Sequence, residues 1–346
     1  MSGGPILAIL PGDGIGPEVT EAALSVLGAV MPSAVRRLRR GLIGGAAIDA
    51  AGEPLPRATL ELCAGCDAVF LGAVGGPRWD GAPRRPEEGL LGLRRALGVY
   101  ANLRPARDLG LPTPLRPELA RGADLLVVRE LQGGVYFGEP RGANAEEAWN
   151  SWRQTAAEVR AVAKVAFSLA RGRRRRVASV DKANVLEASR LWRRVVTEVG
   201  RDFPEVTLEH LYVDAASFEL LRNPRRFDVL LTENLFGDIL SDEAAALAGS
   251  IGVLPSASLG PGPGLFEPVH GSAPDLAGRG TANPTGAILT AALLLTHALG
   301  RADLGERVER AVTAALANHR TPDLGGSART EDVTGAVLLE LGRVAG

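Results

Sequence analysis

The sequence predicts an α/β protein with a largely parallel sheet and more than one lobe. Short apolar runs, typical of buried strands, alternate along the chain with longer amphipathic segments, typical of helices. This alternation favours strand–helix–strand units. The chain has 346 residues, which exceeds the ~250–300 residues at which a single hydrophobic core stops growing. We therefore expect two domains, or one sheet shared by two lobes.

The N-terminal third reads as two strand–helix units joined by glycine-rich turns. After the first strand, PGDGIGPE has its glycines at GxGxG spacing. This is a poor match to the dinucleotide fingerprint and predicts only that a ligand approaches the backbone closely. The loop GAVGGPRWDGAPRRPEEG is long and rich in Gly and Pro, which indicates a functional loop. The expected elements are strands at Ile6–Leu10 and Ala68–Leu71 and helices at Glu18–Val30 and Arg57–Ala64.

The rest of the chain continues the alternation and ends in helices. An arm at 132–152, rich in Gly, Asn and Glu, interrupts it, and the residues from Ser256 onward read as a Gly/Pro-rich loop with one helical turn. The expected strands are Tyr100–Arg107, Asp124–Val128, Arg176–Val180, Val206–Val213 and Asp228–Leu231. The expected helices are Leu90–Leu97, Thr155–Ala170, Glu187–Val199, Leu235–Leu247, Pro284–Leu299, Leu304–Asn318 and Thr330–Val344.

Two carboxylates, Asp238 and Asp242, lie four residues apart on the expected helix Leu235–Leu247, with Asn234 at its N-cap position. This spacing stacks them on one face of the helix, and no Lys or Arg three or four residues away relieves their repulsion. A divalent Mg²⁺ or Mn²⁺ ion suits such oxygens; the alternative is a solvated acidic face. Asp214 directly follows a strand and is either an N-cap or a third metal ligand.

Three arginines, Arg94, Arg104 and Arg129, lie at or near the ends of expected elements. Planar guanidinium groups that converge would bind carboxylates bidentately. Surface arginines are also common in this Arg-rich chain, and the sequence does not decide between the two. Lys182 comes just past the C-terminal end of a strand, where open α/β sheets place their ligands.

The composition excludes several classes of protein. A net charge of −1 argues against nucleic acid as the main partner, and the basic runs Arg36–Arg40 and Arg171–Arg176 are expected to be solvated helix ends. Cys63 and Cys66 form a lone CxxC without further zinc ligands, either a redox pair or, as the flanking pattern favours, two small core residues. There is no signal-peptide pattern and no long apolar run, so we expect no membrane contact and a cytoplasmic location.

Seven motifs in chain order resemble the β-decarboxylating dehydrogenases, the family of isopropylmalate, isocitrate, homoisocitrate and tartrate dehydrogenases. The resemblance covers essentially the whole chain. It rests on PGDGIGPE, GGPRWD, LLGLRRALGVYANLRPAR, VVRELQGGVYFGEPRG, SVDKANVLE, NLFGDILSDEAA and EPVHGSAPDLAGRGTANP.

The resemblance implies a fold that is not a Rossmann fold. It implies a two-lobed open α/β/α sandwich with a large mixed sheet and the active site in the cleft between the lobes. A cofactor-binding lobe would comprise residues 1–98 and 249–346. The substrate, metal and dimerisation lobe would comprise residues 99–248.

The same resemblance implies an NAD-dependent homodimer that oxidises and decarboxylates 3-isopropylmalate in leucine biosynthesis. Arg94, Arg104 and Arg129 would hold the malate carboxylates. Tyr136 and Lys182 would move protons, with Lys182 and Asp214 reaching across from the neighbouring subunit. Mg²⁺ or Mn²⁺ would be held by Asp214, which would also contact the substrate, together with Asp238 and Asp242.

Substrate and cofactor choice also follow from the resemblance. Leu90 and Leu91 would form an apolar wall for the isopropyl group, whose burial stabilises binding by ~0.8 kcal/mol per CH₂, whereas an unpaired carboxylate there would be costly. Asp275 would accept hydrogen bonds from the adenosine ribose and repel a 2′-phosphate, which favours NAD over NADP. The two cofactor loops would run from Gly76 to Glu87 and from Gly271 to Asn283. The expected contacts in and beside them are Gly76, Glu87, His270, Gly271, Ser272, Ala273, Asp275 and Asn283.

Some features depart from the family pattern, and other functions remain to be weighed. Glu233 stands where a small residue is usual, and Glu243 adds a further acid to the metal helix. A regulatory nucleotide-binding subunit without activity would be expected to have lost some of the implied site residues, but all are present. A nucleic-acid-binding role would have to use Arg171–Arg176.

Overall fold

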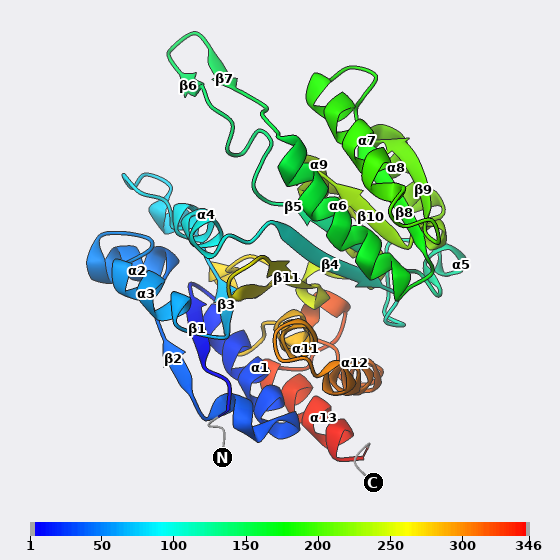
Figure 1. Ribbon diagram of the computed structural model, residues 1–346. Helices are drawn as coiled ribbons and strands as arrows, with labels where there is room; N and C mark the ends of the chain where they lie inside the picture. The colour runs from blue at the N-terminus through cyan, green and yellow to red at the C-terminus, as the bar shows by residue number, and fades with distance from the viewer. Residues whose placement is uncertain (1–3, 344–346) are drawn as a thin grey trace. The chain divides into compact units, whose positions relative to one another are not determined.

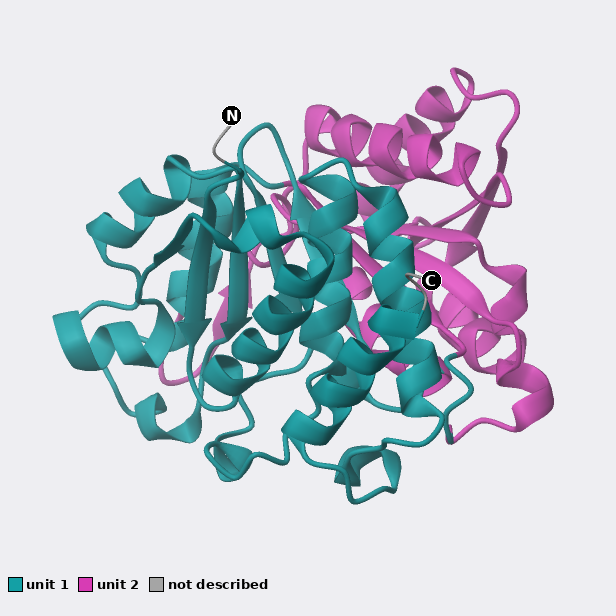
Figure 2. Cartoon of the chain, turned by 90° about the horizontal axis from the view of Figure 1, so that it is seen from below, with its two compact units in different colours: residues 1–99, 109–112, 248–346 teal, residues 100–108, 113–247 magenta. Residues whose placement is uncertain are grey.

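The computed structural model describes residues 4–343, which form two compact units (Figure 2). Unit 1 comprises residues 1–99, 109–112 and 248–346, and unit 2 comprises residues 100–108 and 113–247. Each unit has its own set of five strands, and in each set three of the four strand pairings are parallel and one is antiparallel. The expected α/β class with a mixed sheet is confirmed.

The strands of unit 1 lie in the order β2-β1-β3-β12-β11. Only β11 and β12 pair antiparallel, and they form a hairpin in the stretch that the sequence predicted to be a loop. That prediction was wrong because the strands are short and flanked by Gly and Pro, although Ser256 and Ser258 are fully buried between apolar neighbours. The bounds are β1 Leu7–Gly12, β2 Leu38–Arg40, β3 Ala68–Ala73, β11 Pro255–Leu259 and β12 Gly264–Pro268.

Helix α11 (Thr285–His297) forms the centre of the unit 1 core. It is buried around its whole circumference from Thr285 to Leu295 and packs against β11, β12, α1 and α12 (Figure 1), as expected for so apolar a helix. The other helices are α1 Gly16–Val30, α2 Gly44–Ala51, α3 Arg57–Ala64, α4 Pro86–Leu97, α12 Ala302–Leu316 and α13 Thr330–Arg343. The short 3₁₀ turns are η1 Pro32–Val35, η2 Pro77–Trp79, η4 Ile251–Val253, η5 Pro274–Leu276 and η6 Pro322–Leu324. The predicted last helical residue, Val344, lies outside the described residues.

The strands of unit 2 lie in the order β4-β5-β10-β8-β9, with β4 antiparallel to β5 and the others parallel. An exposed two-stranded hairpin, β6 Arg141–Ala143 and β7 Ala148–Asn150, lies in the segment expected to be an arm (Figure 1). The sheet bounds are β4 Ala101–Arg107, β5 Asp124–Glu130, β8 Arg176–Asp181, β9 Thr207–Tyr212 and β10 Val229–Thr232. The helices are α5 Pro117–Ala120, α6 Ala156–Arg171, α7 Glu187–Gly200, α8 Val213–Arg222 and α9 Asn234–Glu243; η3 is Pro224–Arg226, and α10 Ala245–Ala248 follows α9 in the chain.

The start of α9 corrects the predicted N-cap. Glu233 is the cap, since its carboxylate accepts from the backbone N–H groups of Leu235 and Phe236, and Asn234 is the first helical residue. The helix ends at Glu243 rather than at Leu247. Glutamate is an unusual N-cap residue. Its side chain is long enough to reach the first N–H groups of the helix, and a carboxylate is favourable at a helix N-terminus.

The structure settles two further points of local detail. Of the two alternatives left open for Asp214, the N-cap is excluded, because α8 begins at Val213 and Asp214 lies in its first turn. The run Arg171–Arg176 is not a purely solvated surface. Arg173 donates to the buried carboxylate of Asp228 at 2.9 Å, and Arg174 donates to backbone carbonyls, so these side chains are used inside the fold.

None of the described helices is long and apolar enough to cross a membrane. Cys63 and Cys66 are both buried and unbridged. Burial raises the pKa of the Cys63 thiol to about 12, which keeps it protonated and unreactive. This environment agrees with the interpretation of the pair as core residues.

Candidate active site

In unit 2 the predicted site residues gather around one edge of the sheet. Strands β5, β10, β8 and β9 are parallel, so their carboxyl ends meet at the same edge. Arg129 lies near the end of β5, and Lys182 directly follows β8. Helices α8 and α9, which carry the three predicted metal ligands, begin where β9 and β10 end.

Strand register brings Arg104 and Arg129 together, which the sequence could not show. Asn102 on β4 pairs opposite Arg129 on β5, and Arg104 is two residues along β4 and therefore on the same face. Both arginines are almost fully buried. Helix α9 packs against β5 and presents its acidic face to them.

Asp238 and Asp242 are bound by these arginines. Arg129 forms an ion pair with Asp238, and Arg104 contacts Asp238 at 3.4 Å and Asp242 at 3.2 Å. Because Arg104 bridges both carboxylates, their oxygens face a common point. The positive charge that the helix itself lacks comes from the neighbouring strands.

Burial and neighbouring charges shift the pKa of two groups in this cluster, Asp242 and Tyr136. Burial raises the pKa of Asp242, with Arg104 opposing this effect and the neighbouring Asp238 adding to it. Tyr136 donates its hydroxyl to Asp238 at 2.8 Å. Burial and that carboxylate raise the pKa of Tyr136 to about 12. The phenol is therefore protonated at neutral pH and able to donate a proton.

Lys182 and Asp214 form a second charged group in unit 2. Asp181 on β8 pairs with Tyr212 on β9, so the residues just after the two strands are neighbours. The Lys182 ammonium donates to Asp214 at 2.6 Å, and this bond lowers the pKa of the Asp214 carboxyl. The Asp214 side chain is 68% exposed, so its carboxylate is accessible to a ligand from solvent.

The donor set of α9 fits a hard divalent cation, but only in part. Carboxylate oxygens one helical turn apart are ligands that Mg²⁺ and Mn²⁺ prefer. Within 4–343, however, no group of three or more His, Cys, Asp or Glu side chains is close enough to hold a metal ion. Among the described residues, Asp238 and Asp242 thus offer two carboxylates at one point, a number that suits Mg²⁺, which usually keeps several waters.

In unit 1 three loops meet at a second carboxyl edge, formed by the parallel strands β1, β3 and β12. The N–H of Ile15 donates to the carbonyl of Ser272 at 2.8 Å, and the Ser272 hydroxyl donates to the carbonyl of Gly75 at 2.7 Å. A Cβ on Gly14 would lie 2.0 Å from the Ser272 carbonyl oxygen, so the glycine is required. The turn PGDGIG, the loop around Gly76 and the HGSAPD loop are thus neighbours.

Asp13 joins these loops and is a residue that the sequence analysis missed. Its buried carboxylate accepts from three backbone N–H groups, those of Gly45, Ala46 and Gly75, at 2.7–2.9 Å. An aspartate between two glycines indicates a turn, and no sequence pattern reveals partners 30 and 60 residues away. Glu87 lies in the first turn of α4, against Gly75.

His270 and Asn283 flank the predicted cofactor loop. Burial lowers the pKa of His270, its Nδ1 hydrogen-bonds the Gly271 carbonyl at 3.0 Å, and its buried Nε2 has no partner within the described chain. Asn283 donates to Asp323 at 3.0 Å. An orphaned buried nitrogen fits a bound group with a hydrogen-bonding hydroxyl or amide, such as the ribose or nicotinamide of NAD. Ala273 adopts a left-handed conformation, and Asp275 is exposed in η5.

Arg94 and Leu90 lie one turn apart on α4, on the same face. Arg94 pairs with Glu267 of β12 at 2.6 Å, with both side chains about 10% exposed. Its Nε has no hydrogen-bond partner among residues 4–343. Leu90 and Leu91 are partly exposed, as an apolar wall open to a ligand requires. Glu267 was not predicted, because it lies in the hairpin that was expected to be a loop.

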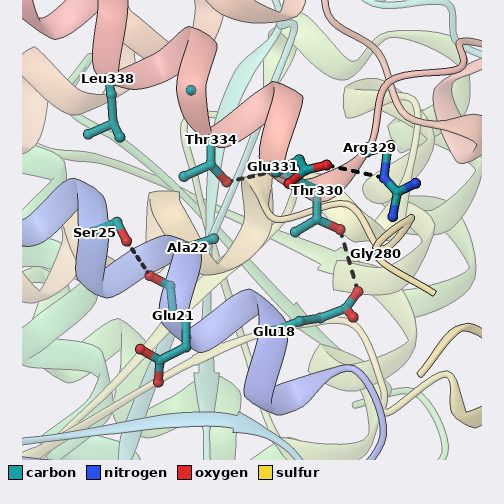
Figure 3. Close-up of a pocket in the computed structure, with 11 residues that line it drawn as sticks. Glu18, Glu21, Ala22, Ser25, Gly280, Arg329, Thr330, Glu331, Thr334 and Leu338 are labelled. Carbon is teal, nitrogen blue, oxygen red and sulfur yellow. Dashed lines mark hydrogen bonds and ion pairs between the residues drawn. The ribbon is translucent and has the colours of Figure 1, made fainter. Parts of the chain in front are cut away.

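A cavity of about 410 Å³ lies between α1 and α13 in unit 1, and Gly280 of the predicted cofactor loop is among the residues that line it (Figure 3). Glu18, Glu21, Arg329 and Glu331 line it, and Thr330 donates to Glu18 at 3.4 Å. None of the individually predicted site residues lines this cavity, so it is not the candidate active site.

Comparison with known proteins now decides the family. The model of the isocitrate/isopropylmalate dehydrogenase family matches residues 6–337. This chain belongs to that family. It is 54% identical over 347 residues to the 3-isopropylmalate dehydrogenase of Deinococcus radiodurans, covering 98% of each chain. It is also 54% identical to that of Geobacillus kaustophilus, covering 93% of this chain and 90% of the relative.

Solved structures of the family share the fold. An isocitrate dehydrogenase from Methylococcus capsulatus aligns with TM-score 0.88 at 36% identity, over 97% of this chain and 99% of that one. A β-decarboxylating dehydrogenase from Thermococcus kodakarensis, in its apo form, aligns with TM-score 0.83 at 40% identity, over 99% and 97%. The prediction of this fold class, distinct from the Rossmann fold, is confirmed.

Proposed function

We propose that this family member is a 3-isopropylmalate dehydrogenase. It would convert (2R,3S)-3-isopropylmalate and NAD⁺ to 4-methyl-2-oxopentanoate, CO₂ and NADH in leucine biosynthesis. The observation that carries the proposal is that Leu90 and Arg94 lie on the same face of α4. The chain is also 54% identical to two proteins named 3-isopropylmalate dehydrogenase. An apolar wall beside a cation suits a malate that bears an alkyl group.

The chain's own residues account for binding and proton transfer. Arg94, Arg104 and Arg129 bind the two carboxylates of the malate group, which guanidinium forks match in geometry. Lys182, after losing its proton, accepts the proton of the substrate hydroxyl. Tyr136 donates its phenolic proton to the enolate carbon after CO₂ leaves; its raised pKa keeps that proton on the phenol until then.

Asp238 and Asp242 of one subunit, with Asp214 of a second, would hold Mg²⁺ or Mn²⁺. Gly76, Glu87, Ser272, Asp275 and the residues flanking them would hold NAD. When bound, the divalent ion acidifies the hydroxyl and withdraws electrons from the ketone during decarboxylation, and the nicotinamide accepts the hydride. The exposed Asp275 carboxylate, followed by Leu276, disfavours a 2′-phosphate.

The proposal includes a homodimer, which is supported by a metal site with two carboxylates per chain and by an apolar surface on unit 2. Phe218 and Leu221 on α8 and Ile239 on α9 are 62%, 41% and 57% exposed, and Ser217 joins the two helices by a 3.1 Å hydrogen bond to Glu243. Exposed apolar patches of this kind mark protein–protein contacts. Ile239 directly follows Asp238, so a second copy seated there would lie beside the proposed metal ligands.

The second candidate substrate class is that of the isocitrate dehydrogenases, to which the Methylococcus capsulatus structure belongs. Purified protein supplied with NAD⁺, Mg²⁺ and 3-isopropylmalate should form NADH. EDTA should stop the reaction, and added Mn²⁺ should restore it. Isocitrate, homoisocitrate and tartrate should be poor substrates, and NADP⁺ a poor cofactor. Turnover of one of those acids without turnover of 3-isopropylmalate would reject the proposal.

A further inference from the structure

Each of the two buried arginines of unit 2 has an asparagine on its inner edge. Asn234 accepts from Arg129 through one oxygen, at 3.0 Å from Nε and 2.7 Å from Nη2. Asn102 accepts from Nε of Arg104 at 2.8 Å. The two asparagines are 1% and 0% exposed.

The outer edges of the same guanidinium groups have a different environment. Arg104 directs Nη1 to the Ser241 hydroxyl at 2.8 Å and to Asp242, and Arg129 directs Nη1 to Asp238. The side chains of Asp238 and Asp242 are 35% and 52% exposed. Each arginine thus has a buried neutral partner on one side and a solvent-accessible, charged environment on the other.

The choice of amide rather than carboxylate has an electrostatic consequence. A buried aspartate would accept the same Nε–H in a stronger, charge-assisted bond, but it would also neutralise the guanidinium at short range and low dielectric. An asparagine oxygen fixes the plane of the group and adds no further negative charge to the carboxylates of Asp238 and Asp242, which already pair with the outer edges. The guanidinium groups therefore keep more positive potential there than they would beside a buried aspartate.

Backbone packing ties the orientation of Arg129 to α9. Asn234 is the first residue of that helix, and its amide donates to the Gly133 carbonyl at 3.5 Å. A Cβ on Gly237 would lie 2.7 Å from Cγ of Arg129, so the helix passes directly over the arginine stem. The asparagine and the stem contact together restrict the guanidinium to one plane.

We propose that Asn102 and Asn234 are positioning residues for substrate binding. They hold Arg104 and Arg129 in a fixed orientation without cancelling the charge that attracts the carboxylates. This inference rests on the proposed function in assigning those arginines to a malate dianion. The inference goes beyond the proposed function because it names the residues that fix the orientation of the two arginines without adding a negative charge beside them.

The test compares Asn234→Asp and Asn102→Asp with the wild-type chain and with Asn318→Asp, which adds the same charge at an exposed position in unit 1. Each aspartate is nearly isosteric and can accept the same hydrogen bonds from Nε, and Asn234→Asp also loses the long 3.5 Å donation to the Gly133 carbonyl. We expect KM for 3-isopropylmalate to rise at least tenfold in both site variants, with the KM for NAD⁺ and the Tm maintained. Asn318→Asp should change none of these values. A purely structural asparagine would give unchanged KM values, and this result would overturn the inference.

A second measurement does not depend on turnover or on the identity of the substrate. Malonate carries two carboxylates without the alkyl group or hydroxyl, and its binding is read as a rise in Tm in the presence of MgCl₂. The rise should be largest for wild type and smaller in both Asn→Asp variants. If wild type fails to oxidise 3-isopropylmalate but shows this pattern with malonate, the proposed function fails and the inference stands. Equal malonate shifts in all chains would contradict the inference.

Discussion

The strand edges at which ligands are expected to bind differ in composition between the two units. In unit 1 the edge consists of backbone turns and glycines, joined by Asp13 through three N–H groups. In unit 2 it consists of charged side chains that hold one another, with Arg104 and Arg129 facing Asp238 and Asp242. The first edge is a scaffold of hydrogen bonds, and the second is a set of opposed charges.

This difference predicts different consequences of mutation. Removing the acceptor that joins the loops of unit 1 leaves buried donors unpaired, so stability should fall first. In unit 2, the side chains of Lys182, Asp214 and Asp242 lie partly in solvent, where ion pairs contribute little to folding. Changes there should therefore affect turnover far more than stability.

The largest expected effect is at Lys182 in unit 2. Lys182→Met should lower kcat by roughly a thousandfold or more, within the range of general acid–base catalysis, because no other group takes the hydroxyl proton. The Tm should change little, since its partner Asp214 is mostly exposed. Lys164→Met on the exposed side of α6 is the matched control. A kcat near that of wild type would show that Lys182 is not the base.

The corresponding change in unit 1 should have the opposite profile. Asp13→Ala removes the acceptor of three backbone donors and should lower the free energy of unfolding by about 3 kcal/mol, together with a higher KM for NAD⁺. Denaturant titration measures the first effect. Asp67→Ala, which removes a single bond to the N–H of Ile6, should cost less than half as much. If Asp13→Ala and Asp67→Ala had the same free energy of unfolding, Asp13 would not be the residue that joins the loops of unit 1.

A smaller effect is expected at the apolar wall of unit 1. Leu90→Ala removes three carbons from the surface expected to contact the isopropyl group. At ~0.8 kcal/mol per carbon, or ~2.4 kcal/mol for three, kcat/KM for 3-isopropylmalate should fall by up to about sixtyfold. Malate, which lacks the isopropyl group, serves as the control substrate and should be turned over by both chains with the same kcat/KM. If kcat/KM fell equally for malate and for 3-isopropylmalate, Leu90 would support the fold of the site and would not contact the isopropyl group.

The smallest effect concerns pH and the start of α9. Burial raises the pKa of Glu233 to about 7, with the backbone donors of its cap opposing the shift. The folded state therefore holds more protons than the unfolded state between pH ~4.5 and 7, and this contribution to stability is lost as pH rises through that window. Between pH 5 and pH 8, the Tm of Glu233→Gln should fall less than the Tm of the wild-type chain. Glu146→Gln on the exposed arm should leave it unchanged, and an unaltered pH profile in Glu233→Gln would contradict the expectation.

The sequence predicted locally encoded structure well and long-range partners poorly. Helix α3 has the predicted bounds Arg57–Ala64, because Pro56 directly before it and Gly65 directly after it mark its ends in the sequence. The β11–β12 hairpin was missed because its strands are too short and too rich in small residues to show a period. Glu233 was recognised as unusual but not as the cap, since Asn234 is the commoner capping residue.

The same limit applies to the candidate site. The spacing of Asp238 and Asp242 correctly placed them on one helix face, but their arginine partners come from strands more than 100 residues away in sequence. Asn102 and Glu267 were invisible for the same reason: strand register decides what they contact. Resemblance to the family supplied the site roles, and the structure supplied the contacts of the individual side chains.

The most direct test of the account is complementation between two inactive chains. If each metal site combines Asp238 and Asp242 of one subunit with Asp214 of the other, then Asp214→Asn and Asp238→Asn chains should each be inactive alone. When they are co-expressed with different tags, half of the dimers are mixed and each has one intact site, so activity should recover to about a quarter of wild type. No recovery in purified mixed dimers would contradict the shared metal site.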